Sequence, residues 1–357
     1  KLKDIELGYA DIAYLQYTGG TTGVSKGAML SHRNMVYNVQ QTITWQGDVY
    51  DDVDQVVAIT ALPLYHIFSL EGNCLSVMAL GGENVLITNP RDFEGFAKEI
   101  AKHKFNLFTG VNTMFASLMH TPSFDKIDFS ELKVSIGGGM AVQPAVAKEW
   151  KQKTGQPILQ GYGLTETSPV AICCVVGEEF TGTIGLPVPS TDVMIAGDDG
   201  NELGLGEIGE ICIKGPQVME GYWQRPKETA EVMLPGGWLR TGDVGRMDDD
   251  GYVWIEDRKK DMILVSGFNV YPNEIENVVV ELDGVLEAAA IGIPDERSGE
   301  VVKIFAVRKN ELLTEQDILD HCKENLTGYK RPKAVEFRDE LPKTNVGKIL
   351  RRALREE

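Results

Sequence analysis

Short apolar runs alternate with amphipathic stretches over the first half of the chain. Four of these runs are β-branched or end in glycine, and they predict buried parallel strands at residues 56–59, 84–87, 107–110 and 134–137. Phe93, Phe96 and Ile100 recur at the spacing of one helix face. Ser31 is the predicted N-cap of an earlier helix. This alternation predicts an α/β domain with a mainly parallel sheet that binds ligands at the carboxyl ends of its strands.

The pattern changes near Val170, where short alternating strands begin to be separated by Gly, Pro and Asp turns. Residues 193–195 and 210–213 are two of these strands, and 248–252 is one of the turns. This arrangement predicts an antiparallel, barrel-like β-subdomain. The charged cluster 257–261 follows it and is a candidate linker or hinge.

The last hundred residues combine helix and strand signals in a smaller unit. Pro272 stands at the first turn of a predicted helix, and Gly284 follows the end of that helix. Thr314 and Asp317 form a capping box for a second helix. Two strands are predicted between the helices, at 288–293 and 302–307. The sequence therefore predicts a small α+β domain, and the complete division is 1–169, 170–257 and 258–357.

Composition narrows the classes of partner. The 357 residues carry a formal net charge of −18, which argues against nucleic acid, although Arg351, Arg352 and Arg355 form a local basic patch. No apolar run reaches the length of a membrane span, and no signal-peptide pattern opens the chain. The five cysteines contain no C-x-x-C pair, which favours free thiols in a reducing compartment.

The glycine-rich segment 17–27 is the first candidate site. Its glycines allow backbone N–H groups to surround an anion, and its hydroxyls and lysine add donors and charge. It is not a P-loop, because Ser25 rather than glycine precedes Lys26. A flexible surface loop is the alternative interpretation. The candidate polyphosphate ligands are Tyr17, Thr18, Gly19, Gly20, Thr21, Thr22, Gly23, Ser25 and Lys26.

The segment 160–167 places an aromatic ring, two glycines, hydroxyls and a carboxylate close together. Tyr162, followed by Gly163, could stack on a purine, and Thr165 could bind a phosphate oxygen. Glu166 could hold Mg²⁺, which prefers carboxylate oxygen. A turn with a solvated glutamate is the alternative.

Four further positions have both a functional and an ordinary interpretation. Asp243 could accept both ribose hydroxyls or lie in a simple turn. The glycines of 135–139 suit a flat base lying against bare backbone. Lys348, in a polar loop, is either a mobile charge or a solubilising lysine. His66, among large apolar groups, is by itself more often a core histidine than a catalytic one.

Six motifs together resemble those of the adenylate-forming superfamily, which includes acyl-CoA synthetases, luciferases and the adenylation domains of peptide synthetases. They are YTGGTTGVSKGAM, LPLYHIF, GYGLTE, GWLRTGD, DRKKDMI and PKTNVGK, in this order. The resemblance covers essentially the whole chain and is greatest to bacterial long-chain-fatty-acid–CoA ligases, which share phrases such as ITNPRD and LVSGFNVYPNEIE.

The resemblance implies a two-step reaction. A fatty acid reacts with ATP to give acyl-AMP and pyrophosphate, and the acyl group then passes to CoA, with Mg²⁺ as the cofactor. It implies that the 18–26 loop wraps the β- and γ-phosphates and that Lys348 bridges the carboxylate and the α-phosphate. The other implied contacts are Gly138, Gly139 and Tyr162 to adenine, Thr165 to the α-phosphate, Glu166 to Mg²⁺, and Asp243 with Arg258 to ribose.

The resemblance also implies a mobile C-terminal domain. The hinge would contain Asp257 and Lys260, and we expect its charged, solvated residues to rotate without exposing a core. A pantetheine channel for CoA would contain Ser266, Gly267 and Phe268. The acyl tunnel would be lined by the 62–80 region, which includes His66, and by Gly110 and Val111.

One departure from the family concerns the N-terminal side. Relatives have a further domain-sized segment before the phosphate loop, whereas here the loop follows only 16 residues. We therefore expect a truncated large domain with unpaired sheet edges. Two alternatives stay open: a fatty-acyl-AMP ligase that passes its product to a carrier protein, and an inactive nucleotide-binding remnant. The expected location is cytoplasmic, with contact to the inner face of the cytoplasmic membrane and homodimer formation left open.

Overall fold

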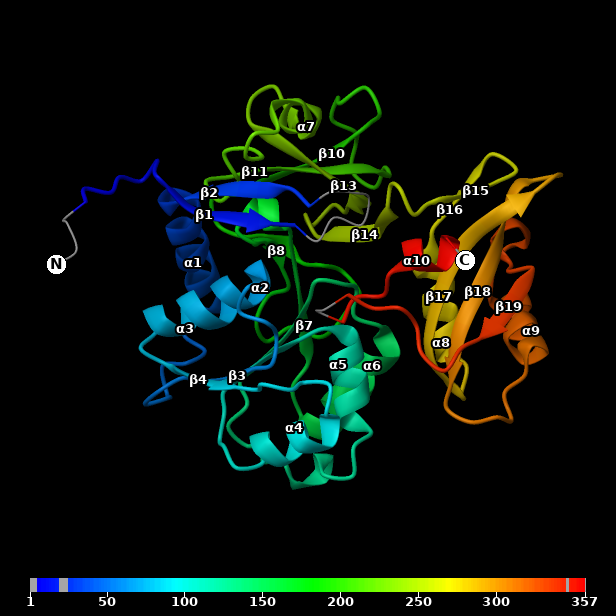
Figure 1. The fold of residues 1–357 in the computed structure, drawn as a ribbon, viewed down its shortest axis with the longest axis horizontal. Coiled ribbons are helices and arrows are strands. Elements are labelled where there is room, and N and C mark those ends of the chain that lie inside the picture. The colour runs from blue at the N-terminus through cyan, green and yellow to red at the C-terminus, as the bar shows by residue number, and fades with distance from the viewer. Residues whose placement is uncertain (1–4, 19–24, 345–346, 357) are drawn as a thin grey trace.

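A seven-stranded sheet forms the centre of the large domain (Figure 1) in the computed structural model, which describes residues 5–18, 25–344 and 347–356. The strand order is β4-β3-β5-β6-β7-β8-β9, parallel from β4 to β7 and antiparallel at β8 and β9. The four strands predicted in the first half are confirmed within a residue. The strands are β3 (Val57–Thr60), β4 (Glu83–Leu86), β5 (Leu107–Gly110), β6 (Val134–Gly138), β7 (Ile158–Gly163), β8 (Val170–Cys173) and β9 (Leu186–Pro187).

One face of this sheet is covered by three helices, α4 (Phe93–Ile100), α5 (Asn112–Met119) and α6 (Pro144–Thr154). An aromatic cluster joins them to β5. The Trp150 ring lies 4.8 Å from Phe115 and 5.3 Å from Phe108, measured between centroids. Its indole N–H donates to Ser135 Oγ on β6 at 3.1 Å. The large rings therefore fill this layer and hold the sheet rigidly behind the strand ends.

The opposite face of the sheet carries the helical segment that precedes β4. Because side chains alternate along a strand, Ile59 faces the first layer while Ala58 packs with Val77 in the second. Ser31 caps α1 as predicted, since its Oγ accepts from the Asn34 N–H. The elements of this layer are α1 (His32–Gln46), α2 (Ile67–Ser69), the π-helical turn η1 (Leu70–Leu75) and α3 (Ser76–Ala79).

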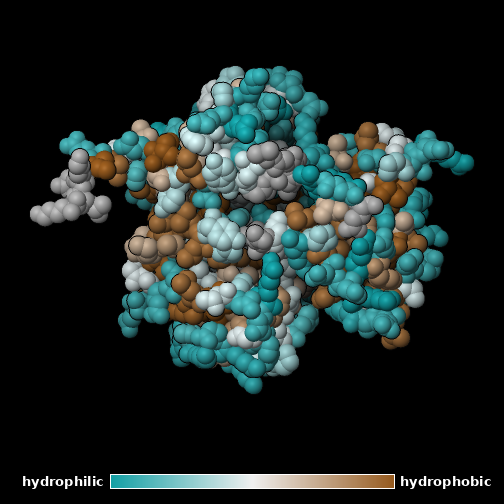
Figure 2. Space-filling model, viewed as in Figure 1, coloured by the Kyte–Doolittle hydropathy of each residue, from teal (hydrophilic) through white to brown (hydrophobic). Residues whose placement is uncertain are grey.

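Large apolar side chains are exposed on this second layer. Figure 2 shows them as brown atoms at the left of the view, over α1 to α3. Met78 on α3 is 66% exposed, and Leu86 on β4 is 56% exposed. β4 lies at the edge of the sheet and, within the described residues, pairs only with β3. The expected unpaired sheet edge is therefore present.

The second sheet has five antiparallel strands, in the order β10-β11-β13-β12 with β14 beside β13. The antiparallel prediction is confirmed, but no pairing within the described residues closes this sheet into a barrel. β8 and β9 belong to the large sheet, so the predicted division at residue 170 does not coincide with the change of sheet. The elements are β10 (Asp192–Ala196), β11 (Gly209–Lys214), α7 (Pro226–Val232), β12 (Met233–Leu234), β13 (Trp238–Met247) and β14 (Val253–Arg258).

A two-stranded hairpin, β1 (Ile12–Tyr17) and β2 (Gly27–Ser31), borders the second sheet. Sequence analysis did not predict β2. Its residues alternate poorly, and they are buried because the Met29 N–H donates to the Gly221 carbonyl and a bridge links Ala28 to Tyr222. Contacts with residues distant in sequence therefore determine that this segment forms a buried strand.

The small C-terminal domain contains a sheet in the order β16-β15-β18-β17, with β19 parallel to β18. Helices α8 and α9 cover one face of it through Ile275 and Ile318, and α10 packs Leu354 on the other. The predicted helices and strands are confirmed, including the Thr314 capping box. The elements are β15 (Ile263–Val265), β16 (Phe268–Val270), α8 (Pro272–Glu281), β17 (Val285–Asp295), β18 (Gly299–Arg308), α9 (Glu315–Asn325), β19 (Ala334–Phe337) and α10 (Arg351–Arg355). Among the described helices, none is long and apolar enough to cross a membrane.

Candidate active site

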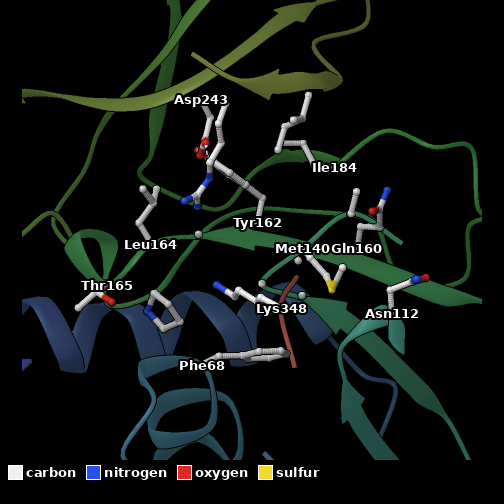
Figure 3. A pocket seen from close by; sticks show the side chains of 18 of the residues that line it. Phe68, Asn112, Met140, Gln160, Tyr162, Leu164, Thr165, Ile184, Asp243 and Lys348 are labelled. Atoms are coloured by element: carbon white, nitrogen blue, oxygen red, sulfur yellow. Dashed lines mark hydrogen bonds and ion pairs between the residues drawn. The ribbon is translucent and has the colours of Figure 1, made fainter. Parts of the chain in front are cut away.

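A cavity of about 1650 Å³ opens at the carboxyl ends of β6 and β7. The large sheet, the second sheet and the C-terminal domain each contribute part of its wall. Figure 3 shows the side chain of Lys348 extending over the Phe68 ring with its amine toward Thr165, while Asp243 lies above. Parts of the chain that are distant in sequence therefore converge on one space, at the place predicted for a parallel sheet.

Glycine backbone forms the wall beside Lys348. Gly139 has a φ of +78°, and a Cβ atom there would lie 2.9 Å from the Lys348 Cε atom. A Cβ atom on Gly138 would lie 3.0 Å from the Phe68 ring. A side chain at either position would require the lysine or the phenylalanine to shift, and the positive φ of Gly139 also favours glycine there.

Tyr162 and Asp243 meet across the two sheets. The Tyr162 hydroxyl donates to Asp243 Oδ2 at 2.7 Å, and Arg258 Nε lies 3.2 Å from Asp243 Oδ1. β13 and β14 pair Asp243 directly with Arg258. Burial and the neighbouring Asp243 charge raise the pKa of the Tyr162 phenol well above its usual value. The predicted adenine and ribose residues thus form one hydrogen-bonded group.

Thr165 and Glu166 lie on a short 3-10 turn, η3 (Thr165–Thr167), directly after β7. Glu166 Oε1 accepts from the Tyr222 hydroxyl at 2.6 Å. Burial, followed by the Glu166 charge, raises the pKa of Tyr222. Lys26 lies over the same ring, with its Nζ atom 4.8 Å from the centroid. Tyr222 therefore links the Glu166 carboxylate to the end of the glycine-rich loop.

The ends of the glycine-rich loop are held together by β1 and β2. The Thr18 N–H donates to the Lys26 carbonyl at 2.9 Å, and Ser25 Oγ donates to the Thr18 carbonyl. Tyr17 also lines the cavity, as do these three residues. The predicted ligands Gly19, Gly20, Thr21, Thr22 and Gly23 lie outside the described residues.

Lys348 reaches the cavity on a loop that the large domain supports. Its N–H donates to Thr344 Oγ1 at 3.1 Å, and the Thr113 hydroxyl on α5 donates to the Gly347 carbonyl at 3.2 Å. Burial and the nearby Arg258 charge lower the pKa of Lys348 to about 8. Lys348 is therefore still an ammonium ion at neutral pH, but it loses its proton at a lower pH than an ordinary lysine does.

His66 lines the cavity at the start of α2. Its Nδ1 atom accepts from the Phe68 N–H at 3.3 Å, which fixes the ring as the cap of that helix. Burial and the Lys348 charge lower the pKa of His66 to about 4, so the ring is neutral at pH 7. Gly110 and Val111 are buried and are not among the residues that line this cavity, so their place in an acyl tunnel stays a prediction.

The hinge residues differ from the expectation of a solvated segment. The Asp257 side chain is only 1% exposed, and it accepts from Arg351 Nη1 at 3.0 Å and from the Asn273 N–H at 2.8 Å. Burial raises the pKa of Asp257 to about 6, although Arg351 opposes this. Lys260 is exposed as expected. Asp257 is therefore a buried link between β14 and α8, and the place of the hinge stays a prediction.

The predicted basic patch at the C-terminus is also corrected. Arg351 is 13% exposed and belongs to the buried group around Asp257. Arg355 Nη1 lies 3.0 Å from Asp261 Oδ1, and Arg352 pairs with Glu356. All three arginines are neutralised by carboxylates, so they do not form a free cationic surface.

Comparison with known proteins identifies the family. A family model described as AMP-binding enzyme matches residues 3–223, and a second, AMP-binding enzyme C-terminal domain, matches residues 274–348. This chain belongs to the AMP-binding enzyme family. A long-chain-fatty-acid–CoA ligase of Escherichia coli O6:H1 is 57% identical over 99% of this chain. The chain spans 63% of the length of that relative.

Two solved forms of one AMP-binding enzyme bear on the arrangement of the domains. The ATP-bound form of MatB from Rhodopseudomonas palustris matches with a TM-score of 0.89 at 32% identity, covering all of this chain and 70% of MatB. The apo form of the same protein, with the same coverage, has a TM-score of 0.76. This structure, in which Lys348 lies in the cavity, is therefore more similar to the ATP-bound form of MatB than to its apo form.

The segment predicted to form the CoA channel does not line the cavity. Ser266 and Gly267 both have positive φ and form the two-residue turn between β15 and β16. Phe268 is 56% exposed and stacks on Tyr329 at 4.8 Å between centroids. The structure thus groups these residues on the small domain, away from the other site residues.

Sequence analysis missed several residues of the cavity wall. Phe68 lies below Lys348 in the view of Figure 3, and Thr42 and Glu71 also line the cavity. Glu71 had a detectable signal, because it is a single carboxylate within the otherwise apolar 62–80 region. Thr42 lies on the polar side of a helix pattern, and only packing shows that it faces the cavity.

Glu166 is the candidate metal ligand, and among the described residues it belongs to no cluster of side chains that could hold a metal ion. Within the described ranges, no group of three or more His, Cys, Asp or Glu side chains could hold a metal ion. The five cysteines are free, as expected. Mg²⁺ commonly binds one or two carboxylates and completes its shell with phosphates and water, so the single Glu166 is compatible with it.

Proposed function

We propose that this chain carries out ATP-dependent activation of a long-chain fatty acid, followed by transfer of the acyl group to CoA. The observation that carries the proposal is the convergence of Lys348 with Glu166 and Asp243 in one cavity. The similarity to relatives named long-chain-fatty-acid–CoA ligase supports the substrate class.

ATP would bind with its adenine against the backbone of Gly138 and Gly139 and beside Tyr162. Asp243, held by Tyr162 and Arg258, would accept the ribose hydroxyls. The glycine-rich loop would surround the β- and γ-phosphates, since backbone N–H groups and Lys26 match their charge. In this placement the α-phosphate lies between Thr165 and Lys348.

Mg²⁺ would be held by Glu166, whose Oε1 atom is already oriented by Tyr222. When bound, the ion would neutralise charge on the phosphates. Side chains of the protein would orient the substrates and stabilise the remaining charge.

In the first step, a carboxylate oxygen of the fatty acid attacks the α-phosphorus of ATP. The new C–O–P linkage forms as the bond from the α-phosphorus to the bridging oxygen breaks, and pyrophosphate leaves with that electron pair. Two anions must approach each other, so the Lys348 ammonium lowers the barrier by contacting both. The neutral His66 can contact the acid without competing for its charge.

The fatty acid chain would occupy the apolar part of the cavity beyond Phe68. Burial of a chain contributes about 0.8 kcal/mol per CH₂, so longer acids should bind more tightly until the space is full. The chain length at which this gain stops is set by the cavity wall.

In the second step, the thiolate of CoA attacks the acyl carbonyl carbon, and AMP leaves with its phosphate oxygen. The thiolate must reach the acyl carbonyl carbon through the space that Lys348 occupies in this structure. We propose that the small domain rotates at Lys260, which withdraws Lys348 and brings Ser266, Gly267 and Phe268 to the cavity. The exposed position of Phe268 leaves it free to make such a contact.

Separate assays of the two half-reactions test this function. Pyrophosphate release that depends on both ATP and a long-chain acid is expected, and thioester formation is expected when CoA is added. The assays use the 357-residue chain. Acyl-AMP formation without thioester would favour a fatty-acyl-AMP ligase. ATP binding without pyrophosphate release would contradict the proposal.

Three parts of the proposal concern the setting of the enzyme. A cytoplasmic location, contact with the inner membrane face and a homodimer stay predictions. Sedimentation of the protein with and without vesicles of anionic phospholipid measures the last two directly.

A further inference from the structure

The deeper part of the cavity is mainly apolar but contains one carboxyl group. The Glu71 side chain is completely buried, on the π-helical turn η1. π-Helical turns are rare and occur frequently at functional sites. The apolar residues that line the same cavity include Trp45, Val134, Ile136, Leu159 and Val176. Burying a carboxyl group in such surroundings costs free energy unless its polar atoms form hydrogen bonds.

This part of the cavity is continuous with the site of Lys348. The Phe68 ring lies 3.0 Å from the Cβ position of Gly138 on one side and 3.6 Å from that of Gly72 on the other. Gly138 belongs to the wall beside Lys348, and Gly72 directly follows Glu71. Lys348, Phe68 and Glu71 therefore line one continuous cavity, which an acyl chain could follow.

Glu71 is incompletely satisfied by the protein. Its Oε1 atom accepts from Ser76 Oγ at 2.9 Å, whereas its Oε2 atom has no hydrogen-bond partner within the described residues. Thr42 Oγ1 is close enough to favour the charged form of Glu71, but the two atoms do not meet hydrogen-bond geometry. Two unpartnered polar atoms therefore lie side by side in the wall, both buried.

Burial favours the neutral form of the carboxyl group. Burial raises the pKa of Glu71 to about 8, and only the hydroxyls of Ser76 and Thr42 oppose the shift. Because Oε1 already accepts a hydrogen bond, we place the proton on Oε2. The wall thus offers one strong O–H donor next to a threonine hydroxyl, which can donate or accept.

We propose that Glu71 and Thr42 form a polar subsite for a hydroxyl group carried on the acyl chain, so that the protein selects hydroxylated fatty acids over unsubstituted acids of equal length. A hydroxyl can accept from Glu71 and donate to Thr42 at once. An ammonium group is a poorer occupant, because it would bring an ion into an apolar wall. The inference rests on the proposed function, since it assigns the acyl chain to this part of the cavity.

The binding experiment uses dodecanoic acid and the series of monohydroxydodecanoic acids with the hydroxyl at each position. Dissociation constants are measured by calorimetry on the wild-type chain. At least one isomer is expected to bind roughly tenfold more tightly than dodecanoic acid, because a buried donor then gains its partner. A series in which no isomer binds more tightly than the parent acid overturns the proposal without any variant.

Matched variants assign the preference to this subsite. Glu71→Leu should reduce the affinity ratio to about one, whereas Glu71→Gln, which retains hydrogen-bonding groups, should keep a preference. Thr42→Val should reduce the ratio in part. Glu99→Leu, on the exposed side of α4, is the control. A ratio that is unchanged in Glu71→Leu would show that the hydroxyl is recognised elsewhere.

Two further readouts separate the possible failures. Absence of pyrophosphate release with every acid contradicts the proposed function, but the binding ratios still decide the subsite. The neutral state of Glu71 is tested by melting temperature. A raised pKa makes the folded protein lose stability as pH rises from about 4.5 toward 8. This decline should be smaller in Glu71→Gln than in wild type, and an identical decline would show that Glu71 is ionised.

Discussion

The nucleotide half and the acyl half of the cavity differ in the partners that their carboxyl groups have. In the nucleotide half, Asp243 is paired with Arg258 and Tyr162, and Glu166 accepts from Tyr222. In the acyl half, Glu71 has no cationic partner within the described residues and stays protonated. The first half orients charged groups for a charged ligand, and the second removes charge so that a hydrocarbon can be buried.

The difference teaches how one space can bind two unlike substrates. Charged groups that are fixed before the ligand arrives need no reorganisation when phosphate charge develops. The apolar wall selects mainly by volume and burial, and the proposed Glu71–Thr42 subsite would add recognition of a hydroxyl group. Lys348 lies at the junction, over Phe68, where the carboxylate must meet the phosphate. Perturbing each side of this junction should therefore affect different steps.

The largest effect is expected from Lys348→Ala. Loss of one oriented contact to a developing charge typically slows a reaction about 10²- to 10³-fold. Acyl-AMP formation, measured by pyrophosphate release, should fall by this amount, whereas thioester formation from supplied acyl-AMP should be spared. Lys343→Ala is the matched control, because Lys343 lies on the same loop and does not itself line the cavity, although its partner Glu287 does. Equal loss of both half-reactions would contradict the assigned role.

A smaller effect is expected from Asp243→Asn, which tests the nucleotide half alone. The substitution keeps the shape but removes the charge that orients Arg258 and would bind ribose. Hydrogen bonds to charged groups contribute about 1.5–3 kcal/mol, so the KM for ATP should rise roughly 10- to 100-fold. The affinity for fatty acid should stay unchanged. Asp192→Asn, at an exposed position on β10, controls for general loss of charge.

The smallest effect is expected in the pH profile of adenylation. The pKa of Lys348 is lowered to about 8, so its cation is lost above that pH, and kcat/KM for ATP should fall about tenfold per unit beyond it. Arg258, Asp243 and Glu166 act on the charge of this lysine, and the lysine in turn lowers the pKa of His66. Lys348→Arg should remove the alkaline limb, because arginine stays charged. A limb that persists in this variant would belong to another group.

Much of the fold could be predicted because its signals are local. The strands at β5 and β6, the Ser31 cap and the Thr314 capping box depend on neighbouring residues, and all are confirmed. β2 was not predicted, because its burial comes from contacts near residue 221. The burial of Asp257 escaped prediction for a similar reason, since its partner Arg351 is distant in sequence.

The sequence by itself determined the family and the residue types of the site, because motifs such as GYGLTE and PKTNVGK combine glycine, hydroxyl and charge in a specific order. Tertiary structure decided which of these residues meet. It brings Lys348 to Gly139, joins Tyr162 to Asp243, and buries Glu71 with no cationic partner among the residues that the structure describes. The physical reason is that pKa values and hydrogen-bond partners depend on burial and on neighbours in space, which residue order alone does not specify.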